Sequence, residues 1–292
     1  MYIKRLVAVS AVAVLAMGMA ACGTKNDDGG GGTGVTGPTL TGVAGKAQKD
    51  KKLVIGVKAD QPGLGLQTGT KYEGFDIEIA EIIATDLGVP QSGIEWKTTV
   101  SANREVFIQQ GTVDLVIATY TINDARKQKV NFAGPYFVAG QDLLVKSDNT
   151  TITGPDTLDG KKVCSVTGST PATRIKTEHP KAQLQLFDTY SKCVEALAAG
   201  SVDAVSTDDI ILAGYAAQAQ YAGKLKVVSK PFSTEPYGVG LKKEDKASCD
   251  RINEILKKAA TDGRYKAAWD ATLGKSGKTM PALDPTKFVN CA

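Results

Sequence analysis

Apolar residues recur at every third or fourth position between residues 74 and 87, which aligns them on one side of a helix. Asp76 and Glu78 place negative charge in the first turn of that helix, where the helix dipole favours it. The pattern therefore predicts a helix over residues 74–87 with one buried face. The apolar positions of this face are Ile79, Ile82, Ile83 and Leu87.

Short apolar runs alternate with helical patterns along the chain from residue 51 onward. Alternation of this kind is typical of mainly parallel sheets that are flanked by helices, so the predicted fold class is α/β. The expected strands span residues 53–58, 113–118, 162–166 and 203–206, and further helices are expected over residues 103–110 and 191–199.

A six-residue pattern occurs twice, as GTVDLV at residues 111–116 and as GSVDAV at residues 200–205, each directly after a helical pattern. Gly suits the end of a helix because it accepts the left-handed conformation needed there. Eight residues beyond each Gly lie Thr119 and Asp208, at matching strand ends. Because ligands of open α/β sheets bind outside the carboxyl ends of strands, the repeat predicts two lobes with a ligand cleft between them. A chance similarity between two helix–strand units is the alternative.

Two extended, β-rich segments flanked by Pro or Gly are expected to cross between the lobes as hinge strands. Residues 134–146 lead out of the first unit, and residues 230–242 lead back. A helical segment over residues 249–273 would then pack onto the first lobe, with Trp269 as a packing residue. The expected divisions are lobe 1 over residues 51–140, lobe 2 over residues 141–232, and a return strand with C-terminal helices over residues 233–292.

The first 21 residues have the features of a secretory signal peptide. Lys4 and Arg5 precede an apolar run over residues 6–16, which is too short to span a membrane as a helix. The segment ends in Ala-Ala-Cys22, which looks like a bacterial lipobox with cleavage before Cys22 and lipid on its sulfur. An ordinary cleavage that leaves Cys22 without a role is the alternative.

Residues 22–50 are expected to form a flexible, lipidated tether. The segment is rich in Gly, Thr, Asp and Lys and has almost no large apolar side chain, so it cannot bury a core. A tether would hold a folded domain away from a membrane surface. A disordered leader with no membrane role is the alternative.

Cysteine usage fits an exported protein. Five cysteines leave four once Cys22 is assigned to lipid, and an even number outside the cell suggests two disulfides. Four cysteines permit three pairings, which the sequence alone does not distinguish. The pairs that are local in sequence are Cys164 with Cys193 and Cys249 with Cys291.

Charge and residue types argue against nucleic-acid binding and against catalysis. Removal of residues 1–21 takes away Lys4 and Arg5 and no acid, so the net charge falls from +4 to about +2, too mild for nucleic acid. The single histidine, His179, lies in a polar, turn-like stretch and is expected to be solvated. We find no Ser/His/Asp set, metal-spaced cluster or phosphate-binding loop, so we expect no metal, no cofactor and no enzyme activity. Two alternatives stay open: a dehydratase on the same α/β fold, and the ectodomain of a sensor.

Two motifs resemble the periplasmic polar amino-acid binding proteins of ABC importers, the family 3 extracellular solute-binding proteins. The helix at residues 74–87 is close to the family signature, and residues 118–126 (ATYTINDAR) are similar to its carboxylate site. The resemblance spans roughly residues 53–273 and is closest to glutamate-binding lipoproteins. It implies a two-lobed periplasmic-binding-protein fold and a monomer. Such a protein is held by lipid at the outer face of the cell membrane and closes on an amino acid for an ABC permease. An aromatic residue that many relatives stack on the ligand is missing near residues 63–66.

The resemblance also implies which residues hold the backbone of an amino acid. A free α-carboxylate favours a bidentate guanidinium with hydroxyl or amide donors, and Arg126 with Thr119 and Thr121 supplies that set. Asp208 matches the position that holds the α-ammonium, although its neighbour Asp209 could exchange roles with it. Ser169 and Thr170 resemble a loop that adds donors to the carboxylate at a helix start.

Four further residues bear on the ligand side chain. Ser101 and Arg104 are similar to a stretch of glutamate/aspartate-binding members in which the Arg meets the side-chain carboxylate, and Lys58 falls where those members carry another cation. Surplus cations select against neutral ligands, which favours glutamate over glutamine. Asp60 lies where glutamine-binding relatives place an acid, and it could pair with Lys58 or Arg104 instead. Glutamine and aspartate therefore stay as alternative ligands.

Overall fold

The computed structural model describes residues 40–276 and 279–292 of the chain. The expected signal peptide over residues 1–21, the lipidation site at Cys22 and the tether up to residue 39 lie outside the described residues. Within the described ranges, no helix is both long enough and apolar enough to cross a membrane.

Lobe 1 is built on a five-stranded sheet with parallel and antiparallel pairs. Its order is β5 (Ile94–Thr98), β1 (Leu53–Val57), β6 (Leu115–Val116), β13 (Glu235–Leu241) and β7 (Asn131–Ala139). β1 pairs in parallel with β5 and β6, whereas β13 runs antiparallel to β6 and β7. A small antiparallel sheet beside it contains β2 (Asp60–Gln61), β3 (Gly65–Thr68) and β4 (Lys71–Glu73).

Lobe 2 repeats the same strand arrangement with different segments. Its order is β10 (Gln183–Phe187), β9 (Lys162–Val166), β11 (Ala204–Asp208), β8 (Gln141–Lys146) and β12 (Leu225–Val227). β9 pairs in parallel with β10 and β11, and β8 runs antiparallel to β11 and β12. Both sheets are therefore mixed, because the fourth strand of each runs opposite to the other four, which share one direction.

The internal repeat read from the sequence corresponds to this structural repeat. β6 and β11 follow the two copies of the pattern and occupy the same place, third in their sheets and parallel to β1 and β9. Gly111 and Gly200 end the preceding helices with φ of 70° and 78°, in the left-handed region. The two strand ends at Thr119 and Asp208 are thus equivalent positions in the two lobes.

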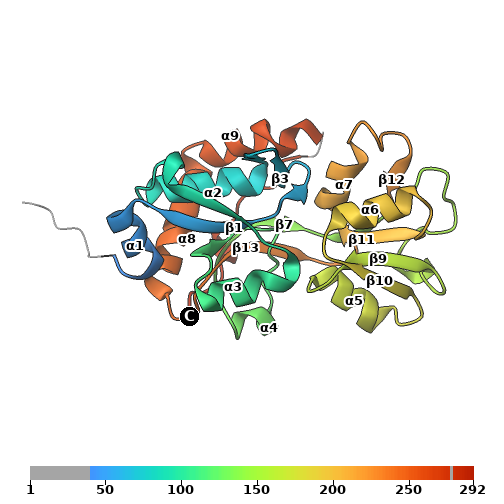
Figure 1. Ribbon diagram of the computed structural model, residues 1–292, viewed down its shortest axis with the longest axis horizontal. Coiled ribbons are helices and arrows are strands. Elements are labelled where there is room, and N and C mark those ends of the chain that lie inside the picture. The colour runs from blue at the N-terminus through green and yellow to red at the C-terminus, as the bar shows by residue number, and fades with distance from the viewer. Residues whose placement is uncertain (1–39, 277–278) are drawn as a thin grey trace, which may run out of the picture. The chain divides into compact units, whose positions relative to one another are not determined.

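Helices cover both faces of the lobe 1 sheet (Figure 1). α2 (Phe75–Asp86) packs against α8 (Lys246–Thr261) and α9 (Arg264–Ala271), as expected for the signature helix and the C-terminal helical segment. Phe75 anchors this layer, with its ring edge-on to Tyr265 and Trp269 at centroid distances of 5.4 and 6.0 Å. α3 (Arg104–Gln110) covers the other face, and α4 (Asp124–Lys127) follows the strand end after β6.

Lobe 2 has the same layering, with α6 (Tyr190–Ala198) and α7 (Asp209–Ala216) on one side of its sheet and α5 (Thr170–Glu178) on the other (Figure 1). His179 ends α5, and its ring lies edge-on to Phe232 at 6.2 Å. The short 3-10 helices of the chain are η1 (Gln91–Gly93), η2 (Ser101–Asn103), η3 (Pro155–Thr157), η4 (Leu273–Ser276) and η5 (Pro285–Lys287).

The two crossings between the lobes lie next to each other. β7 passes into β8 through Gly140, and β13 returns beside β7, with Glu235 paired to Ala139. A Cβ on Gly140 would lie 2.8 Å from the Pro231 side chain and 3.0 Å from the Ser233 carbonyl oxygen. The two connecting segments are therefore packed closely where the chain leaves lobe 1.

Residues 42–50 differ from the expected tether, because they form the helix α1 (Gly42–Asp50) on lobe 1. Small apolar side chains make this docking possible: Val43, Ala44 and Ala47 are buried, and α1 packs against α8. The backbone N–H of Val43 donates to Asp245 at 2.7 Å, and Asp245 also caps α8 by accepting from the Ser248 N–H at 3.1 Å. One carboxylate thus satisfies the starts of two helices, which fixes α1 in place.

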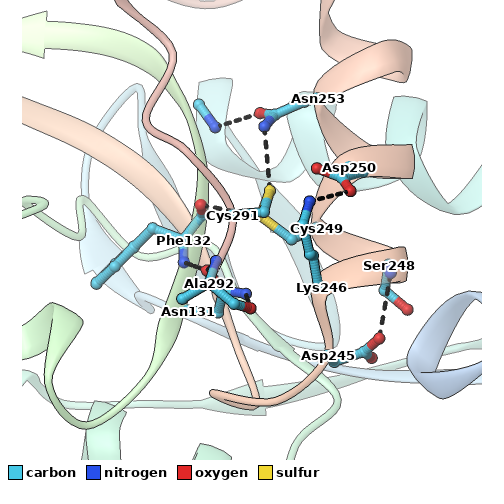
Figure 2. The surroundings of a disulfide bond; sticks show 11 residues. Asn131, Phe132, Asp245, Lys246, Ser248, Cys249, Asp250, Asn253, Cys291 and Ala292 are labelled. Atoms are coloured by element: carbon cyan, nitrogen blue, oxygen red, sulfur yellow. Dashed lines mark hydrogen bonds and ion pairs between the residues drawn. A yellow bond between two sulfur atoms is a disulfide. The ribbon is translucent and has the colours of Figure 1, made fainter.

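Both expected disulfides are confirmed, and each lies within one lobe. Cys164 of β9 is bonded to Cys193 of α6 in lobe 2, and Cys249 of α8 is bonded to Cys291 in lobe 1. Figure 2 shows the surroundings of the second bond, where Asn131 holds Ala292 through its side-chain amide, with distances of 2.9 and 3.2 Å. The segment over residues 279–292 is therefore attached to α8 and β7.

Candidate functional site

The strand ends of the two lobes bring most of the predicted site residues together. Eight of the ten are buried, and only Asp60 and Thr170 are partly exposed. Seven of them line one small cavity, together with Pro171, Tyr190, Thr207 and Ile211. These seven are Ser101, Arg104, Thr119, Thr121, Ser169, Thr170 and Asp208.

Arg126 borders this cavity and connects the two lobes. Its guanidinium donates to the Thr121 carbonyl oxygen at 2.7 Å and to the Gly168 carbonyl oxygen of lobe 2 at 3.1 Å. It also forms an ion pair with Glu105 at 3.2 Å. The start of α4 holds the residue in position, because the Asn123 side chain accepts a hydrogen bond from the Arg126 N–H at 2.9 Å. The expected Arg at a helix start therefore lies at the edge of the cavity.

Arg104 lies inside the cavity and makes hydrogen bonds to carbonyl oxygens. It donates to the carbonyls of Ala118 and Thr119 at 3.2 Å and reaches the Gly168 carbonyl at 3.3 Å. Its guanidinium also lies over the ring of Tyr120, 4.4 Å from the centroid. Burial, and then the neighbouring charge of Arg126, lower the pKa of Arg104 to about 10, so it stays cationic at neutral pH.

Lys58 is the second buried cation of the site. Its ammonium donates to the Ser101 hydroxyl at 2.8 Å, and the Ser101 carbonyl oxygen accepts from Arg104 at 3.2 Å. Burial, and then the charge of Arg104, lower the pKa of Lys58 to about 7. Within residues 40–276 and 279–292, no carboxylate lies within ion-pair distance of Lys58 or Arg104. The site therefore holds the cation Arg104 beside Lys58, which is about half protonated at neutral pH, and both donate to neutral partners.

Asp208 supplies the opposite charge from lobe 2. One of its carboxylate oxygens accepts from the Tyr237 hydroxyl at 2.6 Å, and the other is buried and accepts no hydrogen bond from the described residues. Burial, and then the charge of Glu235, raise the pKa of Asp208 to about 7. Asp209 instead faces the crossing, where it accepts from the Gly140 N–H at 3.3 Å. Of the two neighbouring acids, Asp208 is the one in the cavity.

The loop before α5 approaches lobe 1 more closely than a side chain would allow. Gly168 has φ of 77°, and a Cβ there would lie 2.7 Å from the Cα of Ala102. Its carbonyl oxygen accepts from both Arg104 and Arg126. Ser169 caps α5 by accepting from the Ala172 N–H at 3.1 Å. The loop thus joins the two lobes at one edge of the cavity.

Asp60 lies away from the cavity and also differs from its expected partners. Its carboxylate accepts from the Ser191 N–H at 3.2 Å and from the Tyr215 hydroxyl at 3.1 Å, both in lobe 2. No ion pair joins Asp60 to Lys58 or Arg104 within the described ranges. The acid therefore connects the lobes on the side of α6 and α7 and acts on Lys58 only from beyond ion-pair distance.

Thr119 has a backbone φ of 44°, in the left-handed region that residues other than glycine rarely adopt. Asp76, at the start of α2, holds it there: the carboxylate accepts from the Thr119 N–H at 2.9 Å and from the Tyr136 hydroxyl at 2.8 Å. Asp76 was predicted only as an acid in the first turn of α2, and this second role was not predicted. Its charge is clear from the sequence, but its partners on β7 and after β6 depend on the folded chain.

Glu235 and Tyr237, on β13, were also missed. Both are buried, and they contact site residues from the returning strand, which was predicted only as a hinge: Tyr237 donates to Asp208, and Glu235 accepts from Thr170. An acid within an otherwise apolar strand is the signal that could have identified Glu235.

Comparisons with known proteins agree with this geometry. Residues 53–274 match the family of bacterial extracellular solute-binding proteins, family 3. The glutamate-binding protein GluB of Corynebacterium efficiens is 42% identical over 293 residues, which cover 96% of this chain and 95% of the relative. The ABC transporter glutamine-binding protein GlnH of Bacillus subtilis is 36% identical over 249 residues, covering 85% of this chain and 89% of that protein.

A solved structure supports the same assignment. An ancestral arginine-binding protein bound to glutamine has a TM-score of 0.72 and 36% identity, covering 77% of this chain and 98% of its own. The two-lobed fold implied by the sequence motifs is confirmed. The two relatives are binding proteins rather than enzymes. Because the family match extends through both lobes and most of the chain, this protein belongs to the family 3 bacterial extracellular solute-binding proteins.

Proposed function

We propose that this protein is an extracytoplasmic substrate-binding lipoprotein that captures an acidic amino acid, foremost L-glutamate, and delivers it to an ABC transporter permease. One observation carries the proposal. Lys58 and Arg104 are buried in the same site, both bonded to Ser101, and neither has a carboxylate partner among the described residues. A buried cation without a counter-charge costs several kcal/mol, so the site favours a ligand that brings negative charge.

Charges of opposite sign at the cavity support binding of a free α-amino acid. Arg126, with Thr119 and the start of α5 at Ser169, would hold the α-carboxylate through charge-assisted hydrogen bonds. Asp208 would hold the α-ammonium with its unpartnered buried oxygen. The side-chain carboxylate would then meet Lys58 and Arg104.

The relatives support an amino-acid ligand and supply a second candidate. GluB of Corynebacterium efficiens is named as glutamate-binding, whereas GlnH of Bacillus subtilis is named as glutamine-binding. Glutamine is therefore the alternative. The charge of Asp60 acts on Lys58 without an ion pair, whereas Arg104 stays charged and has no carboxylate at ion-pair distance among the described residues, which weighs against glutamine.

The anchor, the oligomeric state and the lobe divisions complete the proposal. The Ala-Ala-Cys22 junction supports a lipid anchor at the outer face of the cell membrane. We propose that the protein acts as a monomer whose lobe 2 covers residues 141–232 and whose lobe 1 comprises residues 51–140 and 233–292, and that it closes on its ligand before it meets the permease.

Calorimetry with L-glutamate and L-glutamine tests the side-chain assignment. The wild type should prefer glutamate, and Arg104→Met should weaken glutamate far more than glutamine, because the variant keeps apolar bulk and loses the charge. Each lost charge-assisted contact is worth about 1.5–3 kcal/mol, enough to bring the two affinities together.

Lys129→Met is the matched control, since it removes an exposed cation from the groove outside the cavity. This control should leave both affinities unchanged. A wild type that prefers glutamine, or an Arg104→Met variant that weakens both ligands equally, would remove the assignment to glutamate and leave the solute-binding family intact.

A further inference from the structure

Both arginines of the site lie over one aromatic ring, that of Tyr120. The guanidinium carbon of Arg104 is 4.4 Å from the ring centroid, and that of Arg126 is 5.0 Å from the same centroid. The two arginines come from different helices of lobe 1, α3 and α4. Tyr120 is fully buried and is not among the residues that line the cavity, so its effect on a ligand passes through the two arginines.

The apolar core of lobe 1 holds this ring in place. Tyr120 belongs to a cluster of buried side chains with Ile108 and Phe132, and the Phe132 ring lies edge-on to it at a centroid distance of 4.8 Å. β13 passes close to the ring at Gly240, where a Cβ would lie 2.7 Å from a ring carbon. Close packing fixes the ring, which makes it a rigid platform for the two flexible arginine side chains.

The ring attracts two cations that repel each other. Burial, and then the charge of Arg126, lower the pKa of Arg104, so the two charges act on each other. Arg126 is also paired with Glu105 at 3.2 Å, whereas Arg104 has no carboxylate at ion-pair distance among the described residues. An aromatic face attracts a cation through its quadrupole without neutralising it. The ring therefore stabilises the charge of Arg104 and leaves it available to an anionic ligand.

Lobe 2 covers the two arginines and so strengthens their contact with the ring. The Gly168 carbonyl oxygen accepts from Arg104 at 3.3 Å and from Arg126 at 3.1 Å, and both arginines are buried in this arrangement. A cation–π contact is stronger when water is excluded from it. The ring therefore favours the closed arrangement over one in which the arginines face water.

We propose that Tyr120 is a positioning residue that holds Arg104 and Arg126 together through its ring face and so favours closure of the lobes on a ligand that carries carboxylate groups. The inference rests on the proposed amino-acid ligand. Tyr120 lies within the motif at residues 118–126 but was not among the predicted site residues. The role therefore adds a residue to the site that does not itself contact the ligand.

Fluorination of the ring tests the proposal, because fluorine withdraws electron density from the ring face and hardly changes the size of the ring. Tyr120→Phe is the reference, and mono-, di- and trifluorophenylalanine are placed at the same position. In calorimetry, the affinity for L-glutamate should fall with each added fluorine, by about five- to tenfold over the series, the difference expected between a buried and an exposed cation–π contact. An affinity that does not depend on the number of fluorines would overturn the proposal.

Phe107 provides the matched control. It packs against the same cluster from α3, and no cation lies over its ring within residues 40–276 and 279–292. The same fluorinated series at Phe107 should leave the affinity unchanged. An equal fall at the two positions would contradict the proposal, because it would reflect core packing alone.

Tyr120→Leu gives a second test, since it keeps apolar bulk and removes the ring face. Its affinity for L-glutamate should fall at least as far as that of the trifluorinated variant, and an affinity equal to that of Tyr120→Phe would contradict the proposal. If Tyr120→Leu does not fold, the fluorinated series decides, because it keeps the shape of the ring.

The series should give the same order of affinities with L-glutamine, because both ligands carry the α-carboxylate that Arg126 is proposed to hold. A wild type that prefers glutamine would overturn the proposed side-chain specificity. The fall along the series would still decide the role of Tyr120.

Discussion

At the scale of single residues, the buried carboxylate of Asp208 costs the folded protein stability at neutral pH. Its pKa rises from 3.8 to about 7 on folding, first because of burial and then because of the charge of Glu235. The folded state therefore binds the proton more tightly than the unfolded state. The contribution of Asp208 to stability is present below about pH 4 and is lost as pH rises through about 7.

Asp208→Asn should separate stability from binding. At pH 8 the variant should have a higher free energy of unfolding than the wild type, by up to a few kcal/mol, since one pKa unit corresponds to about 1.4 kcal/mol. At pH 4 the two proteins should differ little. Denaturant unfolding at both pH values measures this, and calorimetry should show loss of glutamate and glutamine binding alike.

Asp209→Asn serves as the control for Asp208→Asn, because its carboxylate contacts the Gly140 N–H rather than the cavity. It should retain binding. Loss of binding in this control with normal binding in Asp208→Asn would exchange the roles of the two acids.

At the scale of elements, the loop before α5 determines how closely the lobes approach. Gly168→Ala should weaken every amino-acid ligand by a similar factor, because its Cβ would lie 2.7 Å from Ala102 Cα and 2.9 Å from Ala102 N. The side chains that contact the ligand stay the same, so the preference between glutamate and glutamine should not change. Calorimetry with both ligands measures the two effects.

Gly160→Ala is a control with the same backbone strain. Gly160 has φ of 71°, and a Cβ there would meet no atom within 4 Å. In both variants the free energy of unfolding should fall by about 1–2 kcal/mol, the cost of the left-handed conformation for a residue with a Cβ. Only Gly168→Ala should also lose affinity for the ligand. Equal affinity in the two variants would show that contact with Ala102 does not limit closure.

Elements with a strong periodic pattern could be predicted from the sequence, and elements made by docking could not. The helix expected over residues 74–87 is observed as Phe75–Asp86, and the strand expected over 162–166 is observed unchanged. α1 was missed because GVAGKAQKD has few large apolar residues and gains its stability from α8 and Asp245. Arg104 was identified from a local motif, whereas the partners of Asp60 come from positions 131 and 155 residues away in the chain.

At the scale of the whole molecule, Asp60 forms a second link between the lobes. Its partners lie on α6 and α7, whereas Gly168 precedes α5. Asp60→Ala removes the acceptor of the Ser191 N–H, whereas the Tyr215 hydroxyl keeps the Asp60 carbonyl oxygen as its acceptor. The closed arrangement should become less favourable, and glutamate and glutamine affinities should both fall by about three- to tenfold, the range expected for one net hydrogen bond. Dissociation rates from stopped-flow fluorescence should rise by the same factor.

Tyr215→Phe tests the same link from lobe 2 and should act in the same direction. The double variant should lose nearly as much affinity as the two single variants combined, because Tyr215→Phe removes the hydrogen bond to the Asp60 carbonyl oxygen and Asp60→Ala removes the acceptor of the Ser191 N–H. A change in the ratio of glutamate to glutamine affinity in Asp60→Ala would instead mean that Asp60 senses the ligand side chain.

The sheet topology has a consequence for the order in which the chain folds. The lobe 2 sheet uses strands from a continuous stretch, residues 141–227, so its pairings need no more distant segment. The lobe 1 sheet needs β13, which follows β7 only after the whole of lobe 2. Closing a loop of that length costs more chain entropy than the pairings within lobe 2. We therefore expect lobe 2 to complete its sheet first, and the fully formed second lobe to act as a short connection that brings β13 back to β7.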